Sequence, residues 1–259
     1  GGLVGENHGQ ISLCAVNVYT DVDRAGAHSG GAAGLNDGSI SRTRVTGQIV
    51  GGTAGGLTSV NNGEIISCRA KLSVKGDKEE FAGGLAGANT NRITMSSADA
   101  DVSGGIAAGC VARQFGGELS SCFATGTVRA GSAGGLVGGW QTPAPVPGSF
   151  IFNCYSRSVL YDHEEGTDPP NMSWMAGLVI GTVGPGAMTN CYAAGAIVCR
   201  AITPFLGGLI ADVSGSETVE EGEPDLVHTY SCYWDREISS VFTSQGGSGR
   251  TTREMTYPY

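Results

Sequence analysis

A short acidic stretch, "YDHEEGTD" at residues 161–168, is the part of the sequence closest to a chemical site. Hard cations such as calcium bind where several carboxylates gather, because charged oxygen atoms are their preferred ligands. Asp162, Glu165 and Asp168 are therefore candidate calcium ligands. The stretch is not the two-histidine zinc signature, since no second histidine follows four residues after His163.

Aromatic residues in and near this stretch suggest a different ligand, because an aromatic ring beside polar side chains can hold a sugar ring. The candidate ligand-binding residues are Trp140, Tyr161, Asp162, His163, Glu164 and Trp174. The sequence favours a simpler interpretation, a solvated acidic loop in which Trp174 covers the side of the molecule. The acidic run between residues 217 and 225 is interpreted in the same way, as a solvated loop.

Six of the eight cysteines recur at one position of an internal repeat. They are Cys14, Cys68, Cys122, Cys154, Cys191 and Cys232. Zinc sites need paired C-x-x-C or Cys/His clusters, which are not found here. Disulfides stay open, because neighbouring strands about 4.8 Å apart lie within bridging range. Thr43 and Ser96 occupy the same position and have nearly the size of cysteine, which favours a buried column of free thiols.

Catalysis has little support in the sequence. The four histidines stand in corners and loops, and none is beside an obvious serine or cysteine nucleophile. Some parallel β-helices cleave acidic polysaccharides with an arginine or lysine base and with aspartates on neighbouring turns, but no such column is visible. A hydrolase with paired carboxylates stays open, because spatial pairs cannot be seen in a sequence. We therefore expect no catalytic residue and no cofactor.

These residues are carried by eight copies of a glycine-rich repeat. Aligned on one glycine, the copies start at Gly2, Gly31, Gly56, Gly84, Gly109, Gly135, Gly177 and Gly208, at intervals of 29, 25, 28, 25, 26, 42 and 31 residues. Periods of this length are typical of solenoids. An apolar residue usually follows the aligned glycine, and the early copies then have Asn-x-Gly, which predicts a corner with left-handed backbone angles.

Each copy continues with segments such as "AVNVYTDV" and "RAKLSVKG", in which branched and polar residues alternate. This period of two predicts strands, and one copy gives two or three short ones. Such a unit cannot bury its apolar face alone, but parallel stacking on its neighbours does. The sequence therefore predicts an all-β fold, a right-handed parallel β-helix of about eight glycine-rich rungs.

Composition agrees with this fold and excludes some partners. Glycine supplies 44 of the 259 residues, which disfavours long helices. The net charge of −9 disfavours nucleic acid as a partner. No apolar run reaches the roughly 18 residues of a membrane span, so we expect no membrane insertion by this segment. Because the chain begins inside a repeat, we expect it to be part of a larger protein.

We interpret residues 1–259 as a single solenoid domain with three parts. Residues 1–133 are plain rungs, residues 134–231 are rungs with long loop insertions, and residues 232–259 are a closing segment. The insertions follow Leu136 and Leu209, and a third loop covers residues 156–176. Trp234 in the closing segment is expected to cap the last rung. The half of the chain with the long loop insertions is the expected contact surface.

The segments "GGLVGENHGQIS", "GGLVGG" and "CFATGTV" resemble the GLUG motif, a glycine-rich repeat of bacterial surface and secreted proteins. That family includes adhesin-like proteins and non-catalytic parts of immunoglobulin A peptidases, and residues 232–255 are similar to the segment that often closes such arrays. The resemblance implies an extracellular or cell-surface setting, a stalk or adhesive role, and a host surface protein or glycan as partner. A carbohydrate-binding module and a polysaccharide-degrading β-helix enzyme are the alternatives.

Overall fold

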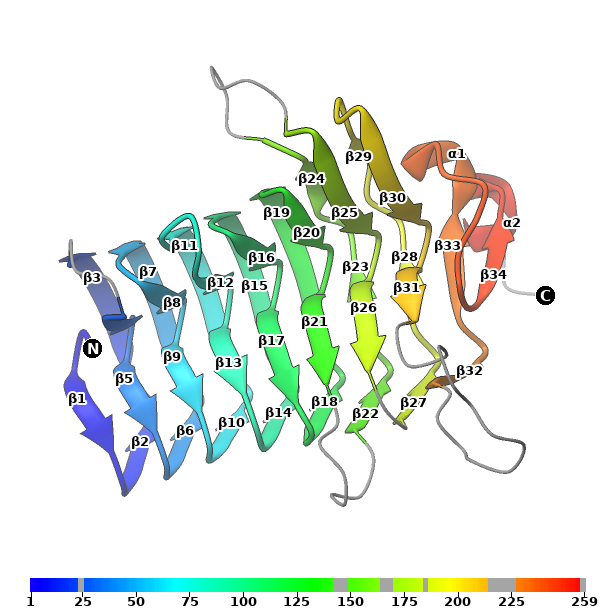
Figure 1. The fold of residues 1–259 in the computed structure, drawn as a ribbon. Coiled ribbons are helices and arrows are strands. Elements are labelled where there is room, and N and C mark those ends of the chain that lie inside the picture. Colours follow the sequence, from blue (N-terminus) through cyan, green and yellow to red (C-terminus); the bar gives the residue numbers. More distant parts are fainter. Residues whose placement is uncertain (23–25, 142–148, 164–169, 184–185, 214–226, 257–259) are drawn as a thin grey trace.

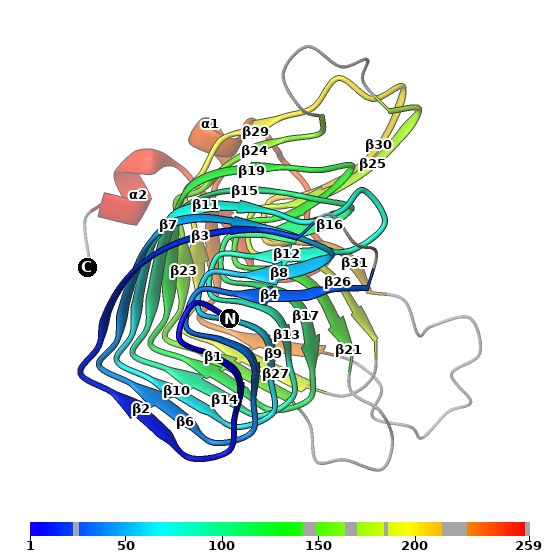
Figure 2. The same cartoon turned by 90° about the vertical axis from the view of Figure 1, so that its left-hand side faces the viewer.

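A computed structural model describes the chain except for residues 23–25, 142–148, 164–169, 184–185, 214–226 and 257–259. The fold is a β-solenoid of about seven turns, built almost entirely from parallel strands (Figure 1). Seen from the N-terminal end in Figure 2, the chain passes clockwise from β1 through β2 to β3 as it recedes, so the solenoid is right-handed. The predicted fold class is confirmed.

Four parallel sheets run along the solenoid, and each plain turn adds one strand to every sheet. The first sheet consists of β1(Val4–Asn7), β5(Ala33–Asn36), β9(Thr58–Asn61), β13(Ala86–Asn89), β17(Val111–Phe115), β21(Val137–Gln141), β26(Val179–Val183) and β31(Ile210–Val213). The second sheet consists of β2(Gln10–Ser12), β6(Ser39–Ser41), β10(Glu64–Ile66), β14(Arg92–Thr94), β18(Glu118–Ser120), β22(Ser149–Phe152), β27(Gly186–Thr189) and β32(Val227–Tyr230).

The third sheet has the longest strands, of seven residues in the early turns. It consists of β3(Ala15–Asp21), β7(Arg44–Val50), β11(Arg69–Lys75), β15(Ser97–Ser103), β19(Phe123–Arg129), β23(Tyr155–Ser156), β28(Tyr192–Ala193), β33(Tyr233–Asp235) and β34(Ser248–Arg250), with β24(Val159–Tyr161) and β29(Ile197–Val198) beside them. The fourth sheet consists of β4(His28–Gly30), β8(Thr53–Gly55), β12(Phe81–Gly83), β16(Ile106–Ala108), β20(Ser132–Gly134), β25(Met172–Ala176) and β30(Thr203–Gly207).

Plain turns therefore have four strands where the sequence predicted two or three. The additional strand is the one in the fourth sheet, which is only three residues long in the early turns and ends next to the Gly-Gly pair. Its short alanine- and glycine-rich sequence gives no period-two signal. The first two sheets hold eight strands and the fourth holds seven, so eight repeat copies make about seven complete turns.

The core is a set of columns in which equivalent residues of successive turns stack in register. Ile40, Ile65 and Ile93 are paired neighbours in the second sheet, and all three side chains are fully buried. The leucines after the aligned glycine, from Leu57 to Leu209, are buried in the same way. Stacking buries the apolar face that one repeat alone would leave in water.

The aligned glycines are required by space. A Cβ atom added to Gly84 would lie 2.0 Å from the carbonyl oxygen of Gly109 and 2.7 Å from Cβ of Ala98. An added Cβ would clash in the same way with the carbonyl oxygen of the next aligned glycine at Gly31, Gly56, Gly109, Gly135 and Gly177. The sharp turn from the fourth sheet into the first therefore tolerates no side chain at this position.

The Asn-x-Gly segments lie at a corner between the first and second sheets, but their backbone is not left-handed as predicted. The asparagines end strands, and Gly38 and Gly63 are confined by the backbone of the preceding turn, about 2 Å from an added Cβ. Left-handed angles occur instead at the corner before the cysteine column. The residues there are Leu13, Arg42, Ser67, Met95, Ser121, Asn153, Asn190 and Ser231.

The corner asparagines form a buried hydrogen-bonded ladder. Each side-chain amide donates to the side-chain oxygen of the next turn, at 2.7 Å from Asn7 to Asn36, from Asn36 to Asn61, and from Asn61 to Asn89. Asn89 donates to Oε1 of Gln114 at 2.9 Å, and Gln114 ends the ladder on the carbonyl of Gly116. The ladder satisfies amides that would otherwise be buried without partners.

The C-terminal end of the solenoid is covered by β34 and two short helices, α1(Arg236–Ser239) and α2(Thr252–Thr256) (Figure 1). Trp234 is 6% exposed, and its ring fills the space above Gly208, where an added Cβ would lie 2.1 Å from the indole. Its Nε1 donates to the carbonyl of Val241 at 3.0 Å. This is the position expected of a cap on the last turn.

Candidate functional site

A stack of aromatic rings runs along the outer face of the third sheet in the later turns. Phe123, Tyr155 and Tyr192 are in-register neighbours on β19, β23 and β28. Their ring centroids are 4.9 Å apart at each step, and the planes differ by 2°. The spacing follows from the backbone, because parallel strands lie about 4.8 Å apart and in-register side chains point the same way.

The stack ends at Tyr192. Tyr233 on β33 is next in register, but its ring pairs with Arg250, whose guanidinium lies 4.1 Å from the ring centroid. Among the residues that the structure describes, no aromatic ring stacks on the face of Tyr192 that points toward the C-terminal cap. Tyr192 is 38% exposed.

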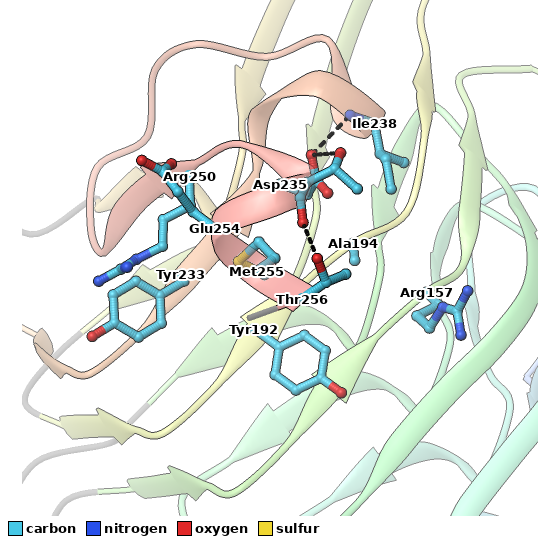
Figure 3. Close-up of a pocket in the computed structure, with 11 residues that line it drawn as sticks. Arg157, Tyr192, Ala194, Tyr233, Asp235, Ile238, Arg250, Glu254, Met255 and Thr256 are labelled. Atoms are coloured by element: carbon cyan, nitrogen blue, oxygen red, sulfur yellow. Dashed lines mark hydrogen bonds between the residues drawn. The ribbon is translucent and has the colours of Figure 1, made fainter. Parts of the chain in front are cut away.

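A cavity of about 700 Å³ opens between this outer face and the two helices of the cap (Figure 3). Tyr192 and Tyr233 line it from the sheet, and Ile238, Met255 and Thr256 line it from the cap. Aromatic and apolar walls with a few polar groups are typical of ligand pockets.

Two arginines lie on either side of the cavity, Arg250 beside Tyr233 and Arg157 beyond Ala194 (Figure 3). Arg157 is exposed and lies between β23 and β24 of the third sheet. Burial and the neighbouring Tyr155 raise the pKa of Tyr192, and the charge of Arg157 opposes that rise. The Arg157 charge therefore acts on the ring that ends the stack.

The two carboxylates of the cavity are engaged in structural hydrogen bonds. Asp235 is 1% exposed and caps α1, accepting from the backbone N–H groups of Glu237 and Ile238 at 3.0 Å. Glu254 is exposed and accepts from the backbone N–H of Thr251 at 2.7 Å. That bond, with the Thr251 hydroxyl, lowers the pKa of Glu254.

The predicted site around Asp162 is arranged differently from the expectation. Its carboxylate is buried and accepts from the backbone N–H groups of Arg200 and Ala201 at 2.5 and 2.7 Å, and from the thiol of Cys199 at 3.3 Å. Burial alone would raise the pKa of this carboxyl, but the hydrogen bond from His163 and those from residues 199–201 lower it. Asp162 fixes the chain between β29 and β30 and is not available to calcium or a sugar.

The other residues of the predicted site lie in different surroundings, and some lie outside the described residues. His163 has an 11% exposed side chain, and its Nδ1 bonds Oδ1 of Asp162 at 2.5 Å. Tyr161 lies under the Arg129 guanidinium, 5.0 Å from the ring centroid. Glu164, Glu165 and Asp168 lie outside the described residues, as do the acidic run at 217–225 and most of the two longer insertions.

Residues 156–176 are not a single loop, since they contain β24 and β25. Trp174 lies on β25 and stacks on Phe205 of β30, with centroids 4.1 Å apart and planes 8° apart. Phe205 is 39% exposed, so this pair is a second aromatic surface. In Figures 1 and 2 the strands β24, β25, β29 and β30 extend beyond the outline of the plain turns. Trp140 lies on β21, paired with Gln114, and its side chain lies outside the described part.

The six aligned cysteines form one column, in which Cys14 is half-buried and the others are buried. All eight cysteines are free thiols. In this column each thiol donates to the carbonyl two residues earlier, as from Cys122 to Ser120 at 3.2 Å. Thr43 and Ser96 make the same bond through their hydroxyls, at 3.0 and 2.9 Å. Threonine and serine therefore replace cysteine here both in size and as donors.

The described residues contain no group of three or more His, Cys, Asp or Glu side chains able to hold a metal ion. Within the same residues, no helix is long and apolar enough to cross a membrane.

Comparison adds no assignment. Neither the models of known protein families nor the curated proteins match this chain. The residues of the site therefore carry the evidence for function.

The aromatic stack was not among the features predicted from the sequence, although a signal for it is present. Four cysteines of the column are each followed by an aromatic residue, in Cys122-Phe123, Cys154-Tyr155, Cys191-Tyr192 and Cys232-Tyr233. In a parallel solenoid, residues at one repeat position become neighbours, so four aromatic residues at one position predict stacked rings.

Proposed function

We propose that this chain is a non-catalytic structural and adhesive module of a bacterial cell-surface or secreted protein, and that it contacts a host glycan. The observation that carries the proposal is the ring stack of Phe123, Tyr155 and Tyr192, which ends on a cavity of about 700 Å³. The flat apolar face of a sugar ring packs well on an exposed aromatic ring. The resemblance to the GLUG motif supports the exported setting.

The position of the cavity also supports an adhesive role. It lies at one end of a solenoid in which each turn contacts mainly its neighbours, so the plain turns act as a spacer. The second aromatic surface, Trp174 on Phe205, belongs to the same C-terminal half. Both surfaces are therefore in the half of the chain with the long insertions.

The state of the cavity carboxylates favours binding over hydrolysis. Glycoside hydrolases use two free carboxyl groups, one on each side of the bond that is cleaved. Here Asp235 caps α1, and Glu254 bonds the backbone at Thr251. Neither carboxylate is placed to serve as general acid or nucleophile.

A glycan array with the purified chain tests the proposal. We expect binding that is lost in Tyr192→Ala and weakened in Trp174→Ala, with the melting temperature of the first variant nearly unchanged because Tyr192 is partly exposed. Tyr19→Ala is the matched control, since Tyr19 is 69% exposed on the same sheet in the first turn. Absence of binding to any glycan would contradict the proposal, and release of shorter products from a bound glycan would contradict the non-catalytic part.

A further inference from the structure

The charge beside the cavity indicates what kind of glycan fits it. Arg157 is exposed, and no ion pair in the described part of the chain involves it. The chain as a whole carries a net charge of −9, and Arg157 places a positive charge among the residues that line the cavity. Asp235 and Glu254 line the same cavity and accept hydrogen bonds from the backbone of the cap, and neither forms an ion pair with Arg157 among the described residues.

The second arginine of the cavity has a different role. The Arg250 guanidinium carbon lies over the Tyr233 ring, 4.1 Å from the ring centroid, in a cation–π contact. Among the described residues the ring stack ends at Tyr192, and Tyr192 lines the cavity. Arg157 and Tyr192 therefore provide a charge and a flat surface at the same edge.

We propose that the cavity binds an acidic sugar, with the sugar ring on the cap-side face of Tyr192 and its carboxylate on the guanidinium of Arg157. This inference rests on the proposed glycan-contact function and names the ligand class. Arginine suits the task because its planar fork donates two parallel hydrogen bonds to a carboxylate. Thr256 adds a hydroxyl at the cap side of the cavity that can accept from a sugar hydroxyl.

Two pairs of probes test this inference by titration calorimetry. One pair is oligogalacturonate and its carboxyl-reduced counterpart, and the other is sialyllactose and lactose. We expect the acidic member of at least one pair to bind about tenfold or more tightly than its neutral counterpart, because a charge-assisted hydrogen bond is lost in the neutral form. The pair that shows the preference identifies the source of the carboxylate, a uronic or a sialic acid.

Variants assign the preference to Arg157. Arg157→Ala should bring the acidic probe to the affinity of the neutral one, and Arg157→Lys should keep part of the preference, because the charge remains while the fork is lost. Arg44→Ala is the matched control, since Arg44 is exposed on the same sheet in the second turn. Its affinity should equal that of the unchanged chain.

The outcomes separate this inference from the proposed function. Equal affinity for acidic and neutral probes, or an acidic preference that survives Arg157→Ala, would overturn the inference while leaving glycan contact in place. No binding to any probe or array glycan would overturn both. A preference that is lost in Arg157→Ala and kept in Arg44→Ala would support both.

Discussion

At the scale of single residues, two ladders of polar groups hold successive turns in register. The asparagine ladder lies in the early turns, and the column of thiols and hydroxyls runs through all of them. In both, one residue type repeats because each side chain bonds equivalent atoms of its own or the next turn. A replacement must therefore keep both the size and the hydrogen-bond donor.

Asn61 tests the asparagine ladder. Its amide donates to Oδ1 of Asn89 and its Oδ1 accepts from Asn36, both at 2.7 Å, and it is fully buried. Asn61→Ala should lower the free energy of unfolding by about 2 to 4 kcal/mol, because two buried polar groups lose partners. Asn62→Ala is the control, since its side chain is exposed in the same corner region and its bonds to Asp37 and Thr90 are open to water. Equal effects in urea unfolding would contradict the ladder's role.

The thiol column predicts a loss of stability in alkaline solution. Burial raises the pKa of Cys154 well above the ordinary 9.0, and the neighbouring Cys154 thiol, with burial, raises that of Cys191 to about 12. Because the folded chain holds these protons more tightly, stability is complete below pH about 9 and falls as the pH rises, by at most about 1.4 kcal/mol per unit for each thiol.

Urea unfolding between pH 7 and pH 11 measures this slope. Cys154→Ser is the matched variant, because serine occupies the same column position at Ser96 and makes the same hydrogen bond. It should unfold with a shallower dependence on alkaline pH than the unchanged chain. Identical slopes would show that the buried thiols do not set the alkaline limit.

At the scale of strands and corners, close backbone approach decides which residues are allowed. Gly84→Ala should cost about 2 kcal/mol or more, because its Cβ would lie 2.0 Å from the carbonyl oxygen of Gly109. Gly131→Ala is the control, as nothing lies within 4 Å of its added Cβ. Thermal unfolding of the two variants provides the comparison, and similar melting temperatures would contradict the steric account.

The elements that the sequence predicts well are those with a strong repeat. Strands with alternating Val, Ile and polar residues, the buried Ile40 and Ile65 column, and the corner at Asn36 all follow from periodicity. The fourth sheet was missed, because three-residue strands of alanine and glycine carry no periodic signal. Left-handed angles at residues such as Met95 could not be predicted, since that corner has no glycine and has asparagine only at Asn153 and Asn190.

The site was less predictable than the fold for a physical reason. The residue types at Asp162 suggested ligand binding, but its bonds to the backbone N–H groups of Arg200 and Ala201 depend on a segment about 40 residues away. The aromatic column at Tyr192 can be predicted only when the repeat is aligned at positions outside the core as well as within it. A sequence gives the residue types of a site more readily than the direction in which each side chain points.

At the scale of the whole molecule, the two ends of the solenoid differ. The C-terminal end is closed by Trp234, α1 and α2, and the same cap forms one wall of the cavity. In a solenoid, stability is roughly the sum of the turns and their interfaces, so a cap protects the turns next to it. The proposed binding and the capping therefore share one short segment.

Trp234→Ala tests the capping role. We expect a loss of about 3 to 5 kcal/mol in unfolding free energy, because a large buried side chain is removed from the last turn. Trp174→Ala is the comparison, since its ring packs on Phe205 at the outer surface and its loss should reduce binding more than stability. Differential scanning calorimetry and glycan binding, measured on both variants, distinguish the two roles. A reversed order of melting temperatures would contradict the assignment.

The most direct test of the account is hydrogen–deuterium exchange of the chain with and without the glycan that the array selects. We predict slower exchange on binding in β28, β33 and α2, which surround the cavity, and no change in β3 and β7 of the plain turns. Protection confined to the early turns, or spread evenly along the solenoid, would contradict the claim that the C-terminal half makes the contact.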